Sequence, residues 1–107
     1  MAKYADMSGY TPEEFALWDE LIRVQNETFY TAKGLPFSFL IRGNEMFVTR
    51  KNKSITRAAV NRAFRLAREE MRVRGFVKGP KRMDVFGSSY LYPIFLRIGI
   101  ITSTPQK

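Results

Sequence analysis

Residues 54–74, SITRAAVNRAFRLAREEMRVR, form the stretch that decides the fold, because they predict one helix with two opposite faces. At about 100° per residue, one side of this helix carries small and apolar side chains: Ala59, Val60, Ala63, Phe64, Ala67 and Met71. The opposite quadrant carries guanidinium and amide side chains: Arg57, Asn61, Arg65, Arg68 and Arg72. Ser54 provides the N-cap, or Thr56 does if the helix begins later, and Gly75 ends the helix. The sequence therefore predicts a helix that packs on a core through one face and meets a polyanion through the other.

A β-hairpin is predicted immediately before this helix, in FSFLIRGNEMFVTRK, residues 37–51. Gly43-Asn44, with the glycine first, favours a type II′ turn, which pairs Arg42 with Glu45 and sets the register of both strands. One face of the hairpin is then apolar: Phe37, Phe39, Ile41, Met46 and Val48. Because a lone two-stranded hairpin is marginally stable in water, we expect this face to pack against the apolar side of the helix.

The first helix of the chain is predicted over residues 12–32. Thr11, Pro12 and Glu14 provide an N-cap, a proline at the first helical position and the glutamate of a capping box. Apolar side chains continue at helical spacing, and Gly34 supplies a C-terminal cap.

The complete prediction is a fold of the α+β class, with the order helix, β-hairpin, helix, helix. A turn follows the basic helix, and a last helix begins at Ser88 or Ser89. The 107 residues contain no internal repeat and no long linker, so we expect one domain over residues 1–107. Its ends, residues 1–10 and 102–107, are expected to be loosely ordered.

The residue types that this chain lacks exclude several kinds of chemistry. With no cysteine and no histidine, it has no thiol nucleophile, no thiolate or imidazole metal ligand and no imidazole base. Adjacent acidic residues such as Glu69-Glu70 point apart on a helix and form no catalytic carboxylate pair. We therefore expect a protein that is not an enzyme and binds no metal or cofactor. No apolar run approaches the roughly 20 residues that span a bilayer, so we expect no membrane partner and a cytoplasmic location, which a cysteine-free chain fits.

Positive charge is concentrated in the second half of the chain. Residues 1–50 contain five Lys/Arg and seven Asp/Glu, whereas residues 51–107 contain thirteen Lys/Arg and three Asp/Glu. This asymmetry favours a basic surface on one side of the fold, either a solvated face or a site for nucleic acid. We predict a nucleic-acid partner, DNA in preference to RNA. The predicted contact residues are Lys51, Lys53, Thr56, Arg57, Asn61, Arg62, Arg65, Arg68, Arg72, Lys78, Lys81 and Arg82.

The first part of the basic helix, SITRAAVNRAFRLA, has three residue pairs at regular spacing: Thr56-Arg57, Ala59-Val60 and Ala63-Phe64. This pattern resembles the recognition helix of winged-helix and helix-turn-helix DNA-binding regulators. The resemblance implies a winged-helix-like arrangement, in which the helix enters the major groove and a hairpin contacts the neighbouring backbone. The residues that it implies face the bases are Thr56, Arg57, Asn61 and Arg62. The present sequence departs from that family by placing a hairpin where the family has a short helix and a tight turn.

A protein-interaction or homodimerisation module is the alternative function. The hairpin and the C-terminal segment carry large side chains that suit an interface: Leu40, Phe47, Phe86, Tyr90, Tyr92 and Phe95. Exposed together, these side chains form an apolar patch for a second copy of the chain or for another protein. The opposite interpretation is that they fill the core of a small domain.

Overall fold

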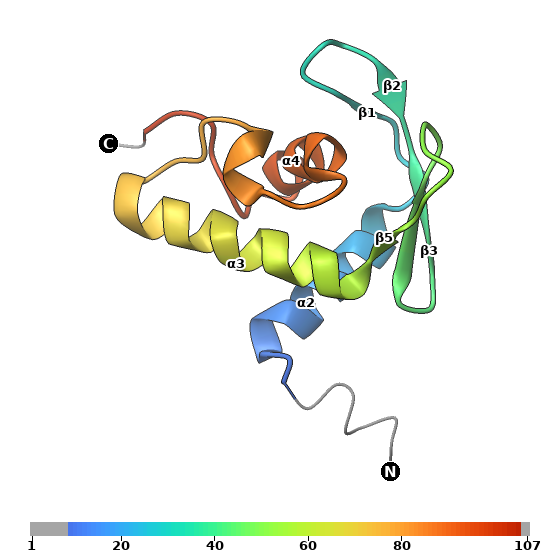
Figure 1. The fold of residues 1–107 in the computed structure, drawn as a ribbon, viewed down its shortest axis with the longest axis horizontal. Coiled ribbons are helices and arrows are strands. Elements are labelled where there is room, and N and C mark those ends of the chain that lie inside the picture. The colour runs from blue at the N-terminus through green and yellow to red at the C-terminus, as the bar shows by residue number, and fades with distance from the viewer. Residues whose placement is uncertain (1–8, 106–107) are drawn as a thin grey trace.

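Three α-helices and two small antiparallel sheets make up residues 9–105, the part of the chain that the computed structural model describes (Figure 1). The elements in chain order are α2 (Pro12–Val24), β1 (Phe29–Tyr30), β2 (Pro36–Phe37), β3 (Phe39–Arg42), β4 (Glu45–Val48), β5 (Ile55–Thr56), α3 (Arg57–Arg74), the 3-10 helix η1 (Pro80–Met83) and α4 (Ser88–Arg97). In Figure 1, α2 lies on one side of α3 and α4 on the other, with the strands beyond the N-terminal end of α3. The predicted small single domain of the α+β class is confirmed.

The two ends of the chain are described only in part. Residues 1–8 and 106–107, which belong to the termini predicted to be loosely ordered, lie outside the described residues. Within the described part, the Thr102 carbonyl oxygen accepts the Val77 N–H at 2.8 Å, and Ile101 is buried in the core.

Helix α2 begins with the predicted capping box. Thr11 Oγ1 accepts the Glu14 N–H at 3.1 Å, and Glu14 Oε1 accepts the Thr11 N–H at 3.0 Å, so both halves of the box are formed. The inner face of α2 packs in the core through Leu17, Trp18, Leu21 and Val24.

Helix α2 ends at Val24, so the prediction of a helix to residue 32 is wrong at its C-terminal end. The Gln25 side-chain oxygen accepts the Ile41 N–H at 2.9 Å, and the N–H of Asn26, whose φ is +72°, donates to the Phe39 carbonyl oxygen at 3.0 Å. These bonds cover the free edge of β3, which otherwise exposes unpaired backbone groups. Asparagine is a weak helix former, so pairing with the sheet outweighs continuation of the helix.

Gly34 does not end a helix as predicted, because it lies in the turn between β1 and β2. Its φ is +82°, a conformation that favours glycine. The two short strands pair Phe29 with Phe37 and Tyr30 with Pro36.

The hairpin of β3 and β4 has the predicted register, from the Phe39–Val48 pair to the Arg42–Glu45 pair. Gly43 has a φ of +59°, which fits the first central position of a type II′ turn. The predicted apolar face points into the core: Phe37, Phe39, Met46 and Val48 are buried, with Ile41 at the margin. Strand β5, which the sequence did not predict, pairs with β4 and extends this sheet to three strands.

Helix α3 begins at Arg57 with Thr56 as its N-cap, the later of the two predicted starts. Gly75, with a φ of +80°, ends the helix as predicted. The apolar face is buried through Val60, Ala63, Phe64 and Ala67. The Phe64 ring meets the Phe95 ring of α4 edge-on, with centroids 6.5 Å apart. The core is therefore shared by α3, α4, α2 and the sheets.

Helix α4 begins at Ser88, and its side chains close the core: Tyr90, Leu91, Tyr92, Ile94 and Phe95 are buried. The Tyr92 hydroxyl donates to the Val77 carbonyl oxygen at 2.6 Å. Burial raises the pKa of Tyr92 above its ordinary value of 10.0. The predicted turn between α3 and α4 contains η1.

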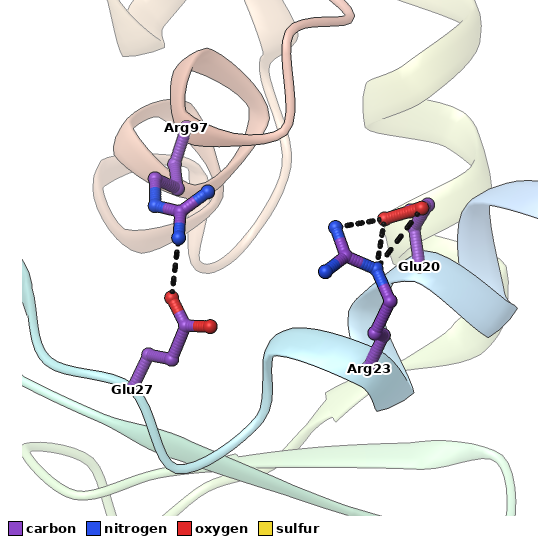
Figure 2. A network of polar contacts seen from close by, with 4 residues as sticks. All are labelled: Glu20, Arg23, Glu27 and Arg97. Atoms are coloured by element: carbon purple, nitrogen blue, oxygen red, sulfur yellow. Dashed lines mark hydrogen bonds and ion pairs between the residues drawn. The ribbon is translucent and has the colours of Figure 1, made fainter.

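Two ion pairs lie near the junction of α2, α4 and the sheet (Figure 2). Arg97 Nη2 of α4 lies 3.0 Å from Glu27 Oε1, whereas Glu20 and Arg23 form a 2.7 Å pair within α2. All four side chains are substantially exposed, and exposed pairs contribute little to stability. The apolar core, rather than these pairs, holds α4 in place.

Candidate nucleic-acid interface

Arg57 begins α3 but does not lie on an exposed face, since only 7% of it is accessible. Its guanidinium carbon lies 5.1, 5.4 and 4.9 Å from the ring centroids of Tyr10, Phe15 and Trp18. Nη1 donates to Asn44 Oδ1 at 3.1 Å, and the Arg57 N–H donates to the Asn44 carbonyl oxygen at 2.8 Å. The guanidinium group thus joins α2, α3 and the hairpin turn. The prediction that Arg57 faces nucleic acid is wrong, because these contacts enclose its side chain.

Asn61, one turn further along α3, is fully buried. Neither polar atom of its carboxamide has a hydrogen-bond partner among the described residues. Asn61 is buried because α2 crosses α3 at this point. Trp18 of α2 contacts Arg57, Glu14 of α2 contacts Arg65, and Asn61 lies between these two contacts. The prediction that Asn61 reads a base is therefore wrong as well.

Glu14 anchors α2 to α3. Arg65 Nε donates to Glu14 Oε2 at 2.6 Å, with Glu14 buried and the Arg65 side chain 59% exposed. Burial by itself raises the pKa of Glu14, but the hydrogen bonds from Arg65 and the Thr11 N–H, together with the charges of Arg65 and Arg68, outweigh it. The pKa of Glu14 therefore lies below its ordinary value of 4.5. In the sequence, the capping box already explains the presence of Glu14, so the sequence did not predict its ion pair with Arg65.

Arg65, Arg68 and Arg72 border one open hollow on the outer side of α3, together with Glu69. Their spacing of three and four residues brings them to neighbouring positions on the helix surface. Arg72 is ion-paired with Glu69, whereas Arg68 has no ion pair with another described residue. Arg62, three residues before Arg65, is also exposed. Four guanidinium groups against two carboxylates, those of Glu14 and Glu69, leave this outer row with a net positive charge.

The remaining basic side chains gather around η1, on another side of α3. Nε of Arg74 and Nε of Arg82 lie 3.4 and 3.9 Å from Glu70 Oε2. In an α-helix of 3.6 residues per turn, Glu70 points about 160° away from Arg68 and Arg72. The single basic surface expected from the charge distribution is therefore divided into two surfaces by the body of α3.

We call the second surface the η1 corner. Its members are Lys53, Lys78, Lys81, Arg82 and Phe86. Lys53 Nζ lies 4.8 Å from the Phe86 ring centroid, which brings the β4–β5 connection beside the loop before α4. Lys51 is exposed in the same connection. Phe86 was not assigned to a basic surface from the sequence, although an aromatic residue within a basic loop is a signal for nucleic-acid binding.

The N-terminal end of α3 is packed against α2 and the hairpin turn. Of the residues that the recognition-helix resemblance places on bases, Arg57 and Asn61 are buried, and Arg62 is exposed. Thr56 is exposed, but its Oγ1 accepts the Ala59 N–H at 3.1 Å as the helix cap. Base contacts from this end of the helix are therefore restricted.

The aromatic side chains of the C-terminal segment mostly fill the core, since Tyr90, Tyr92 and Phe95 are buried. Leu40 and Phe47 form an exposed cross-strand pair on the outer face of the hairpin. Because Tyr90, Tyr92 and Phe95 are buried, they do not form one exposed apolar patch with Leu40 and Phe47.

No helix within residues 9–105 is long and apolar enough to cross a bilayer. In the same range, no three acidic side chains lie close enough together to hold a metal ion. Comparison of the chain with known protein families, curated proteins and solved structures finds no match in any of the three.

Proposed function

We propose that this chain is a non-enzymatic nucleic-acid-binding protein, with DNA favoured over RNA, and that the outer row of α3 binds phosphates. The observation that carries the proposal is the exposed series Arg62, Arg65, Arg68 and Arg72, three of which border one hollow. From the first to the last arginine the helix rises about 15 Å at 1.5 Å per residue. Duplex DNA presents one negative charge per about 1.7 Å of its axis, so this length meets several phosphates.

The local contacts of these arginines leave them able to bind an anion. Guanidinium groups bind phosphate through two parallel hydrogen bonds, a stronger interaction than an exposed pair with a carboxylate. Arg72 can exchange Glu69 for a phosphate, because both side chains are more than half exposed. Arg68 has no carboxylate partner among the described residues, so it can bind a phosphate without breaking an ion pair. DNA is favoured because the major groove of B-DNA admits a helix, whereas that of A-form RNA is narrow.

The triple variant R62A/R68A/R72A tests the proposal. Arg57 and Arg65 are left unchanged, because they hold α2 on α3. Losing three phosphate contacts makes the slope of log K against log salt less negative by about 2.7. Fluorescence anisotropy at several salt concentrations measures that slope for duplex DNA, single-stranded DNA and RNA.

A matched control is R23A/K33A/R42A, which removes three exposed positive charges from other parts of the surface. Both triple variants carry the same net charge. We expect the control to retain nearly all of the salt slope. Equal losses in the two variants, or no binding of any nucleic acid by the unchanged protein at low salt, refute the proposed site.

A second candidate function is self-association through the outer face of the hairpin, which the exposed Leu40–Phe47 pair favours. Burying this pair against a second copy removes apolar surface from water. Sedimentation velocity tests it: a dimer that Phe47→Lys converts to monomer supports the candidate, and a monomer at high protein concentration eliminates it.

A further inference from the structure

The η1 corner contains an exposed aromatic ring beside unpaired positive charges. Phe86 is 42% exposed, and Lys53 Nζ lies 4.8 Å from its ring centroid. The ring and Lys81 line an open hollow of about 760 Å³, within the range of ligand pockets at about 300–1,000 Å³. Ser89 and Asp84 also line this hollow.

The charges around the hollow suit an anion next to the ring. Among the described residues, neither Lys53 nor Lys81 forms an ion pair. Asp84 is the acidic side chain in the lining, so the two ammonium groups outnumber the carboxylate. Both lysines lie on flexible stems and can reach different phosphates of one strand.

The backbone around Phe86 is held in place by specific contacts. Ser88 Oγ accepts the Val85 N–H at 3.0 Å and donates to the Val85 carbonyl oxygen at 2.7 Å. Gly87 has a φ of +88°, and a Cβ built on it would lie 2.3 Å from Cδ1 of the buried Ile55. These contacts fix the backbone from which the Phe86 side chain extends, which lowers the backbone entropy lost on binding.

We propose that Phe86 stacks on an unpaired base of a single-stranded nucleic acid, while Lys53 and Lys81 bind the flanking phosphates. An exposed aromatic ring between basic side chains is the arrangement that binds single strands without reading their sequence, because every base has a π face. The paired bases of a duplex are stacked on each other and do not offer this face. The inference rests on the proposed nucleic-acid binding, to which it adds a preference for unpaired bases.

The test compares two fluorescent strands with the same number of phosphates, oligothymidylate and a strand of stable abasic residues. We expect the unchanged protein to bind the thymine strand about tenfold more tightly than the abasic strand, the size of one stacking contact. Phe86→Ala should make the two affinities equal, whereas Phe86→Trp should keep the difference. Tyr30→Ala is the matched control, because Tyr30 is 59% exposed and lies outside the η1 corner. The double variant K53A/K81A should weaken binding of both strands alike.

The outcomes separate this inference from the proposed function. If the unchanged protein binds both strands equally, or if Phe86→Ala keeps the tenfold difference, the stacking site is refuted while phosphate binding stands. If neither strand nor duplex DNA binds at low salt, both proposals are refuted. Circular dichroism and urea unfolding establish that each variant is folded before its affinity is compared.

Discussion

Replacing Glu14 by glutamine tests how α2 is held on α3. Glutamine keeps the size of the side chain and one carbonyl oxygen, which can still accept the Thr11 N–H of the capping box. Its amide nitrogen then faces Arg65 Nε. Both groups are hydrogen-bond donors, so the 2.6 Å hydrogen bond from Arg65 Nε to Glu14 Oε2 is lost. The substitution therefore removes the charged link between the helices and leaves the helix cap in place.

The expected loss follows from the burial of the two partners. A hydrogen bond to a charged group contributes about 1.5–3 kcal/mol. The Arg65 side chain is 59% exposed and regains water after the change, so we expect a loss of about 1–2 kcal/mol. For a domain close to this size, 1 kcal/mol corresponds to a Tm shift of about 4–8 °C.

The loss should also depend on pH. The pKa of Glu14 is lower in the folded chain than its ordinary value of 4.5. Its stabilisation is therefore complete above about pH 4.5 and disappears as the pH falls through the folded pKa. At lower pH, Glu14 of the unchanged protein is protonated and resembles glutamine, so the free energies of unfolding of the two proteins should converge.

Urea unfolding measures these free energies from neutral to acid pH, with the fluorescence of Trp18, the single tryptophan, as the probe. Trp18 is 3% exposed, so its emission reports the loss of the core. Glu13→Gln is the control, because Glu13 is exposed and precedes Glu14 directly. Equal effects of the two substitutions, or a difference for Glu14→Gln that persists in acid, would show that the link to Arg65 does not stabilise the fold.

Three further substitutions test other parts of the core. Asn61→Leu should raise the free energy of unfolding by about 1–2 kcal/mol in the same urea assay, because it removes a buried, unpartnered carboxamide; a loss of stability contradicts this. Tyr92→Phe should cost about 1 kcal/mol at pH 7. Because the folded pKa of Tyr92 is raised, stability is present below pH 10 and is lost as the pH rises through that folded pKa. Alkaline urea titrations should show less of this loss in Tyr92→Phe. Gly87→Ala should destabilise more than Gly75→Ala, by about 1–3 kcal/mol, since both glycines have positive φ but only Gly87 abuts Ile55; equal Tm values contradict the packing argument.

Features whose determinants are adjacent in the chain could be predicted from the sequence. The type II′ turn at Gly43 fixes the hairpin register by itself, and the capping box at Thr11 starts α2. The end of α2 could not be predicted in this way. Its hydrogen-bond partners, Phe39 and Ile41, lie more than a dozen residues later and become available only when β3 forms.

The same distinction explains the errors in the candidate site. Arg57 and Arg68 lie within about 20° of each other around the helix, so periodicity assigns both to one face. One is buried and the other exposed, because α2 covers only the first turns of α3. Angle around a helix predicts which residues share a face, but the neighbour that crosses the helix decides how much of that face stays exposed.

The division of the arginines by burial also determines what kind of binding α3 can support. Arg57 and Asn61, the side chains suited to reading base edges, are enclosed in the core. Arg62, Arg65, Arg68 and Arg72 remain exposed, all beyond the first turn of α3, so the free N–H groups of the helix N-terminus do not reach a phosphate bound there. Affinity at this surface must therefore come from the guanidinium groups alone. Stacking on Phe86 would be equally tolerant of base identity. The outer row thus predicts binding that depends on salt, and Phe86 adds a preference for unpaired bases. Neither surface is expected to read base sequence.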